Sequence, residues 1–106
     1  MLNKSIIFFM TFLLSISVLA DDIANVSIKK YEFIPKEVTV KKGTKIRWTN
    51  NEKRQYHSVW FEERGDPEPD YFFPEEFFEL EFNETGTFSY RCGPHPKMVG
   101  IVTVTE

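Results

Sequence analysis

The chain has 106 residues, 42% of them hydrophobic and 16% aromatic, and its thirteen basic and sixteen acidic side chains give a formal net charge of −3. This acidic balance excludes the basic surface typical of nucleic-acid-binding proteins. The length suffices for one small domain, and a single cysteine excludes an internal disulfide.

The N-terminus has the three-part pattern of a secretory signal peptide. Lys4 gives it a positive start, residues 6–18 carry no charge, and Val18-Leu19-Ala20 offers a cleavage site. The thirteen residues of the apolar stretch fall short of the ~20 that span a bilayer. We therefore expect a signal peptide at 1–20 and a mature domain at 21–106, with a net charge of −4 once Lys4 is removed and no stable membrane insertion after cleavage.

After this segment, apolar side chains alternate with polar ones, which is typical of β-strands. The pattern predicts an all-β Greek-key sandwich or barrel of seven to eight short strands, in antiparallel or mixed sheets. Residues 62–76 are the least regular and predict a loop or one short helical turn. An immunoglobulin-like sandwich has a similar strand count, but its cysteine pair is missing. Strands are expected around Val26 and Ile28, Val38 and Val40, Ile46 and Trp48, Val59 and Phe61, Phe78 to Phe82, Phe88 and Tyr90, and 101–104.

Charge is spread unevenly along the chain. Residues 62–81 hold nine acidic side chains against the single base Arg64, whereas residues 29–54 hold nine basic ones against three acidic ones. Two interpretations remain open. The stretches are ordinary solvated faces of strands, or the acidic stretch forms a single face whose field attracts a positively charged partner.

The segment CGPHPKM at 92–98 gathers three donor side chains into seven residues. Phe88, Tyr90 and Cys92 alternate, so if the two aromatic rings face the core, Cys92 turns the same way at the end of its strand. Gly93-Pro94 then breaks the strand. A loop this tight can bring a thiolate, an imidazole and a thioether to one point.

These donors, together with the second histidine of the chain, suit copper. His57, Cys92, His95 and Met98 supply two imidazoles, one thiolate and a weak axial thioether, the trigonal set of copper electron-transfer sites. Zinc prefers more cysteines or a fourth strong ligand, and catalytic copper requires more histidines. Each residue taken singly is more often a core or surface residue, but the use of both histidines and the only cysteine favours a site for one copper ion.

Three stretches of the mature chain resemble one protein family. They are FIPKEVTVKKGTKIRWTN at 33–50, YHSVWF at 56–61 and NETGTFSYRCGPHPKMVGIVTV at 83–104. The family is the cupredoxins, the small type 1 blue copper proteins. The C-x-x-H-x-x-M spacing, with a proline on either side of the histidine, is most similar to amicyanins; plastocyanins have a longer interval between histidine and methionine.

The resemblance implies a role for each ligand. Cys92 is the strongest ligand and carries most of the electronic coupling, His57 is the buried imidazole, and Met98 is the distant axial ligand. His95 is the solvent-facing imidazole through which electrons pass.

The resemblance also implies a supporting asparagine and exposes some departures. Asn50, or Asn51 in its place, matches the family's asparagine that ties the two ligand loops together. Tyr56 stands where a proline commonly precedes the first histidine, Gly93 replaces a hydroxyl residue, and Lys97 replaces a bulky apolar residue of the partner-docking patch.

We therefore expect a non-enzymatic, monomeric one-electron carrier of the bacterial periplasm that cycles between Cu(II) and Cu(I). Its partners are expected to be redox proteins, such as a c-type cytochrome or a periplasmic dehydrogenase, bound transiently. The alternative is a periplasmic copper-binding protein for delivery, storage or resistance. Such proteins favour exposed sites rich in methionine or histidine, and Met98 is the only methionine after the signal segment. A metal-free interaction domain is a third interpretation.

Overall fold

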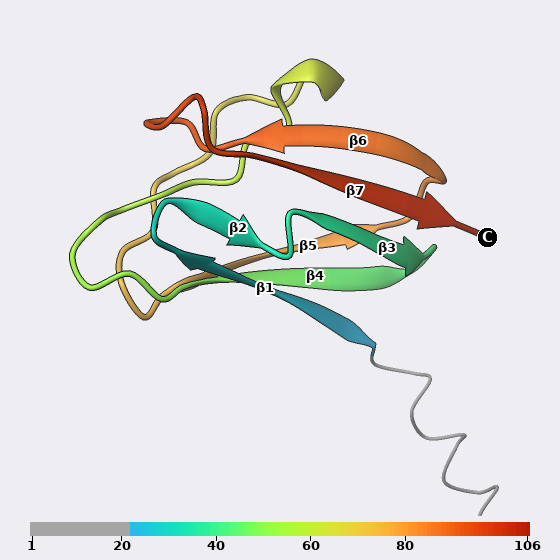
Figure 1. Ribbon diagram of the computed structural model, residues 1–106. Helices are drawn as coiled ribbons and strands as arrows, with labels where there is room; N and C mark the ends of the chain where they lie inside the picture. Colours follow the sequence, from blue (N-terminus) through green and yellow to red (C-terminus); the bar gives the residue numbers. More distant parts are fainter. Residues whose placement is uncertain (1–21) are drawn as a thin grey trace, which may run out of the picture.

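Two β-sheets packed face to face form the domain in the computed structural model, which describes residues 22–106 (Figure 1). The larger sheet has the strand order β2-β1-β4-β5 and the smaller one β3-β7-β6. The elements are β1 Ile23–Lys29, β2 Glu32–Ile34, β3 Glu37–Lys41, β4 Thr44–Asn50, the 3-10 turn η1 Glu62–Arg64, β5 Phe77–Phe82, β6 Gly86–Arg91 and β7 Val99–Thr105. The predicted signal peptide and its cleavage site lie outside the described residues.

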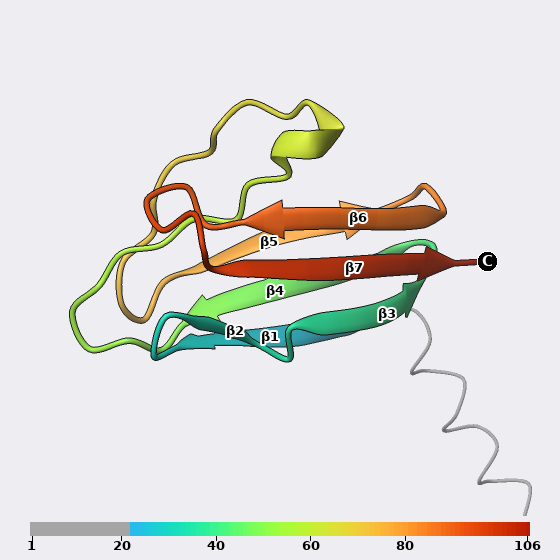
Figure 2. The ribbon, with the colours of Figure 1, turned by 45° about the horizontal axis from the view of Figure 1, so that its top comes forward.

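Parallel and antiparallel pairs occur in both sheets. β1 runs parallel to β4 and β3 runs parallel to β7, whereas the remaining neighbours are antiparallel. This confirms the predicted all-β sandwich with mixed sheets. The ends of β4 and β6, the starts of β5 and β7 and the β1–β2 turn all lie at one end of the sandwich, on the left in Figures 1 and 2, and we call this the loop end. Within residues 22–106, no helix is long and apolar enough to cross a membrane.

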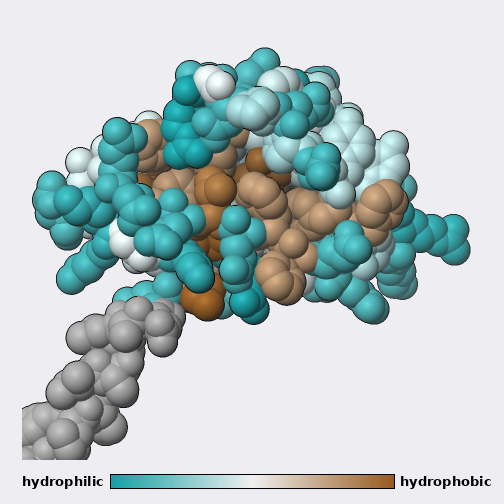
Figure 3. Space-filling model, turned by 180° about the vertical axis from the view of Figure 1, so that it is seen from behind, coloured by the Kyte–Doolittle hydropathy of each residue, from teal (hydrophilic) through white to brown (hydrophobic). Residues whose placement is uncertain are grey.

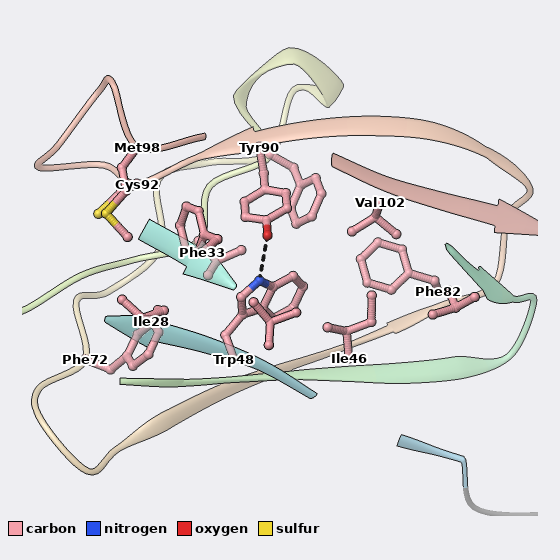
Figure 4. Packing of buried hydrophobic residues seen from close by; sticks show 14 of the residues in the cluster. Ile28, Phe33, Ile46, Trp48, Phe72, Phe82, Tyr90, Cys92, Met98 and Val102 are labelled. Atoms are coloured by element: carbon pink, nitrogen blue, oxygen red, sulfur yellow. Dashed lines mark hydrogen bonds between the residues drawn. The ribbon is translucent and has the colours of Figure 1, made fainter. Parts of the chain in front are cut away.

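The core lies between the sheets and is centred on Trp48, which is fully buried. Alternation along the strands sends one set of side chains inward, as the sequence predicts. The indole Nε1 of Trp48 in β4 donates a hydrogen bond to the phenol oxygen of Tyr90 in β6 at 3.0 Å (Figure 4). The two sheets are therefore joined by a polar contact inside an apolar core.

Tyr90 has room for its ring because Gly100 lies directly opposite it in the β6–β7 ladder. A Cβ atom at Gly100 would overlap the Tyr90 ring. The glycine is therefore required by the close approach of the ring, which in turn allows the ring to reach Trp48.

The predicted strand at Val59 and Phe61 is wrong, because residues 57–61 form only two isolated bridges. His57 pairs with Phe72, and Trp60 pairs with Arg91 at the end of β6. Within four residues the segment changes its pairing partner from the chain at Phe72 to the end of β6 at Arg91, so a regular ladder cannot form with either partner. Val59 and Phe61 are nonetheless buried, because the chain at these bridges remains extended and alternation is preserved.

The irregular segment at 62–76 contains the predicted short helical turn, η1, and is otherwise loop. η1 ends at Gly65, whose φ of 96° lies in the left-handed region that glycine tolerates. The guanidinium of Arg64 lies 4.9 Å from the centre of the Phe61 ring and forms an ion pair with Asp66 at 2.6 Å. These contacts hold the start of the segment against the core.

We predict that Tyr90 makes the fold sensitive to alkaline pH. Burial raises the pKa of Tyr90 to about 12, although the hydrogen bond from Trp48 opposes the rise, whereas a phenol in the unfolded chain has a pKa of about 10. The fold disfavours the charged phenolate of Tyr90. The contribution of Tyr90 to the free energy of unfolding is therefore complete below pH ~10 and is lost as the pH rises toward 12, by about 3 kcal/mol in all.

Urea unfolding at a series of pH values from 8 to 11.5 measures this loss. Tyr90→Phe should flatten the decline above pH 10, and it should cost about 1 kcal/mol at neutral pH because the hydrogen bond is lost. Tyr56→Phe, which changes an exposed tyrosine, is the matched control. Equal slopes for the two variants would show that Tyr90 is not the responsible group.

Candidate metal centre

The predicted donors come together at the loop end from two loops. His57 lies in the connection between β4 and η1, and Cys92 and His95 lie in the connection between β6 and β7. The Cys92 Sγ atom is 3.5 Å from the Nδ1 atom of each histidine. One ligand atom from each of the three residues lies within 4.8 Å of the others, so a single ion can contact all three.

Met98 is positioned by the closure of the β6–β7 loop. The Met98 amide donates to the carbonyl of His95, and the Cys92 amide donates to the carbonyl of Met98, both at 2.9 Å. The Met98 side chain is buried and lies with Cys92 at the loop end of the core (Figure 4). The loop thus brings the thioether to the same end of the core as the thiol, as the sequence predicts.

Cys92 is fully buried and accepts a hydrogen bond at its sulfur. The Ser58 amide donates to Sγ at 3.4 Å, and the Ser58 hydroxyl accepts from the Gly93 amide at 2.9 Å. Burial raises the pKa of the Cys92 thiol, and this effect outweighs the hydrogen bond from Ser58, which lowers it. The thiol is therefore protonated without metal at neutral pH, and metal binding must release that proton.

His57 is fully buried, and a carboxylate fixes its ring. Glu52 Oε2 lies 3.0 Å from the Nε2 atom of His57 and also accepts from the Tyr31 amide at 2.8 Å. Burial lowers the pKa of His57 although Glu52 opposes this, so the ring is neutral. With Nε2–H donating to the carboxylate, the Nδ1 lone pair points at Cys92, which is the orientation that a metal ligand requires.

Glu52 is a functional residue that sequence reasoning missed. Its side chain is only 11% exposed. Burial raises the pKa of Glu52, but the hydrogen bonds from the Tyr31 amide and His57 outweigh it, so that the pKa is lowered overall. In the sequence, Glu52 is one acidic residue among charged neighbours in a loop, and nothing marks it as the buried one.

Asn50 organises the first ligand loop, the connection between β4 and η1 that carries His57. Its side-chain amide donates to the carbonyls of Gln55 at 2.9 Å and Phe72 at 3.1 Å, and its Oδ1 accepts from the Glu52 amide. Asn51 instead donates to the Ser27 hydroxyl. Among the hydrogen bonds of residues 22–106, Ser58, and not Asn50, reaches the loop of Cys92 and His95.

Aromatic rings surround His95, which is half-buried. The Tyr31 ring meets the His95 ring edge-on with centroids 4.9 Å apart, and it meets the His57 ring at 5.7 Å. Tyr56 lies 6.5 Å from His95 and stacks on Tyr71 at 5.2 Å. The structure thus places one imidazole inside the protein and the other near the surface, as the family resemblance implies.

The donor chemistry fits copper. A thiolate and a thioether are soft ligands, imidazoles are borderline, and all four donor side chains lie at one end of the core. A β-sandwich with this donor set at its loop end defines the class of small, single-copper electron-transfer domains.

Comparisons with known proteins give the family. The chain belongs to the copper-binding proteins of the plastocyanin/azurin family, whose profile matches residues 20–105. It is 37% identical to amicyanin-alpha of Methylorubrum extorquens over 83 residues, or 74% of this chain and 69% of that protein. It is 36% identical to amicyanin of Paracoccus versutus over 88 residues, or 78% of this chain and 65% of that protein.

The fold agrees with this assignment. The crystal structure of Paracoccus versutus amicyanin superposes with a TM-score of 0.72 at 31% identity, covering 83% of this chain and 86% of that one. Copper is therefore the cofactor, and the protein is an electron carrier rather than an enzyme, as predicted.

We predict that Asn50→Ala loosens the first ligand loop. The variant removes three hydrogen bonds from a fully buried site, so the unfolding free energy of the copper-free protein should fall by about 3 kcal/mol, at about 1 kcal/mol per bond. Asn51→Ala, which removes one exposed hydrogen bond, is the control and should cost less than about 1 kcal/mol. Urea unfolding of both variants is the measurement, and equal losses would contradict this role for Asn50.

Proposed function

We propose that His57, Cys92, His95 and Met98 hold the copper ion and that the protein carries single electrons in the bacterial periplasm. One observation supports this above all: the Cys92 sulfur lies 3.5 Å from the Nδ1 atom of each of the two imidazoles. Donors held in place by hydrogen bonds from neighbouring residues rearrange little between Cu(II) and Cu(I), which favours fast electron exchange. The half-buried His95 is the route by which an electron reaches the surface.

A role in copper delivery or storage fits the burial of the donors less well. Cys92, His57 and Met98 are all buried. A protein that hands its metal to another needs ligands that the recipient can reach and displace. Only His95 is accessible to that extent.

The proposed location rests on the sequence of the N-terminal segment, with cleavage after Ala20 to give a domain of residues 21–106. Mass spectrometry of the protein expressed with its full N-terminus in a bacterial host tests both points. A periplasmic product that begins at Asp21 is expected. A full-length cytoplasmic product would contradict the proposal.

The ligand set is tested by adding Cu(II) to the copper-free protein. One equivalent should produce the intense blue of charge transfer from thiolate to copper, and Cys92→Ser should abolish it, because residues 22–106 contain no other thiol. Met98→Gln should keep the colour and lower the reduction potential, because a harder axial ligand favours Cu(II). A colourless wild-type complex would refute the site, and an unchanged potential would remove Met98 from it.

The acidic stretch at 62–81 spans elements associated with both sheets. η1 packs beside β6 of the smaller sheet, whereas β5 belongs to the larger sheet. Three of the nine acidic residues form ion pairs with arginines: Glu62 with Arg91, Asp66 with Arg64, and Glu79 with Arg47. Three of the nine negative charges are therefore neutralised locally, which weakens the field expected from this stretch.

Four of the remaining acidic residues belong to the segment at 68–76. This segment also carries Tyr71 and Phe73, which are 43% and 51% exposed. Seen from behind, the molecule shows hydrophobic side chains extending to its loop end, on the right in Figure 3, between hydrophilic ones. We propose that a positively charged redox protein, such as a c-type cytochrome or a dehydrogenase, docks transiently on the surface of the segment at 68–76. The interface should bury less than about 1,200 Å². The four acidic residues are Glu68, Asp70, Glu75 and Glu76.

We predict that electron transfer to a basic cytochrome slows as salt is added, because opposite charges steer the encounter. Replacing Glu75 and Glu76 together by Gln should lower the association rate about threefold or more at low ionic strength and flatten its salt dependence. Glu84→Gln, in the β5–β6 turn at the opposite end, should have a smaller effect. Stopped-flow mixing across a salt series is the measurement. Association rates that do not depend on salt would show that these carboxylates do not steer the partner.

A further inference from the structure

Gly93, the residue after Cys92, is a glycine because of what lies against it. A Cβ atom at this position would overlap Oε2 of Glu68 and lie 2.8 Å from the Ser58 hydroxyl. Gly93 is not among the glycines with positive φ, so its backbone conformation is open to other residues. The requirement is therefore one of space: the missing side chain leaves the place that the Glu68 carboxylate occupies.

Glu68 therefore lies against the backbone that positions the copper-binding sulfur. The Gly93 amide donates to the Ser58 hydroxyl, and the Ser58 amide donates to the Cys92 sulfur. The Tyr71 hydroxyl donates to Glu68 Oε2 at 3.5 Å. No ion pair within residues 22–106 involves Glu68, so no cation cancels its charge there.

We propose that Glu68 sets the reduction potential of the copper centre, and that Gly93 is the residue that permits its approach. This inference rests on the ligand set proposed above. The oxidised centre carries one more positive charge than the reduced centre. A nearby carboxylate stabilises the oxidised form more, so Glu68 holds the potential low.

The size of the effect is limited by solvent. Glu68 is exposed, so water and salt screen its charge, and the effective dielectric constant is high. We expect Glu68→Gln to raise the ratio of Cu(I) to Cu(II) affinity by about threefold to tenfold at low ionic strength, where tenfold corresponds to about 59 mV for one electron. The shift should shrink as salt is added, whereas the loss of a structural contact would not respond to salt in this way.

The experiment compares Glu68→Gln, Gly93→Ala, the double variant and Glu84→Gln. Glu84→Gln removes the same charge at the end remote from the site. Redox titration followed by the blue absorption gives each potential, and competition with Cu(I) and Cu(II) chelators gives the two affinities. Gly93→Ala should raise the potential because its methyl group displaces the flexible carboxylate. The salt-dependent part of the shift in the double variant should be no larger than that of Glu68→Gln, because both changes remove the same charge from the site. Any effect of the new methyl group on the nearby Ser58 hydroxyl would not depend on salt.

Several outcomes would overturn the inference. A Glu68→Gln shift no larger than that of Glu84→Gln would do so, as would a shift that does not depend on salt. Additive salt-dependent shifts in the double variant would also contradict it. If the wild-type protein shows no blue band and no reversible couple, the ligand set fails and the inference falls with it. If the wild-type protein shows the blue band and a reversible couple, but Glu68→Gln does not shift the potential, only the inference about Glu68 fails.

Discussion

A buried thiol and a buried imidazole are held 3.5 Å apart at the loop end, and the surrounding structure maintains this contact. Placing polar donors inside a protein is unfavourable unless each has a partner. The sulfur of Cys92 has the Ser58 amide, and the ring of His57 has the Glu52 carboxylate. Every one of these partners lies on a loop, so the loops themselves must be fixed. Asn50, at the end of β4, does this through three hydrogen bonds.

Rigidity at the loop end depends in turn on how the two sheets are joined. One ligand loop follows β4 of the larger sheet and the other follows β6 of the smaller sheet. Any sliding between the sheets would therefore separate His57 from Cys92. Aromatic packing around Trp48 and its hydrogen bond to Tyr90 oppose such sliding, since Trp48 lies in β4 and Tyr90 in β6. The core thus sets the geometry of the site as well as the stability of the domain.

The sequence predicts the sandwich and the donor cluster because both follow local rules. Alternation reports which face a strand buries, and the C-x-x-H-x-x-M spacing brings its donors together within one tight loop. The strand expected at 59–61 fails because its pairing changes neighbour within a few residues. Glu52, Ser58 and Glu68 could not be recognised because their roles depend on distant partners. The ion pairs of Glu62 and Glu79 could not be predicted for the same reason, since strand order decides which carboxylates meet arginines.

The β1–β2 turn couples a hairpin to a metal ligand. Lys30 and Tyr31 both have positive φ, at 52° and 61°, which is unfavourable for residues other than glycine. The Tyr31 amide of this strained turn and the imidazole of His57 share one oxygen of Glu52. If either the Tyr31 amide or the His57 ring moves away, the nearly buried Glu52 carboxylate loses one of its hydrogen-bond donors. We therefore expect the hairpin tip and the loop that carries His57 to open together in local unfolding, although more than twenty residues separate them in the chain.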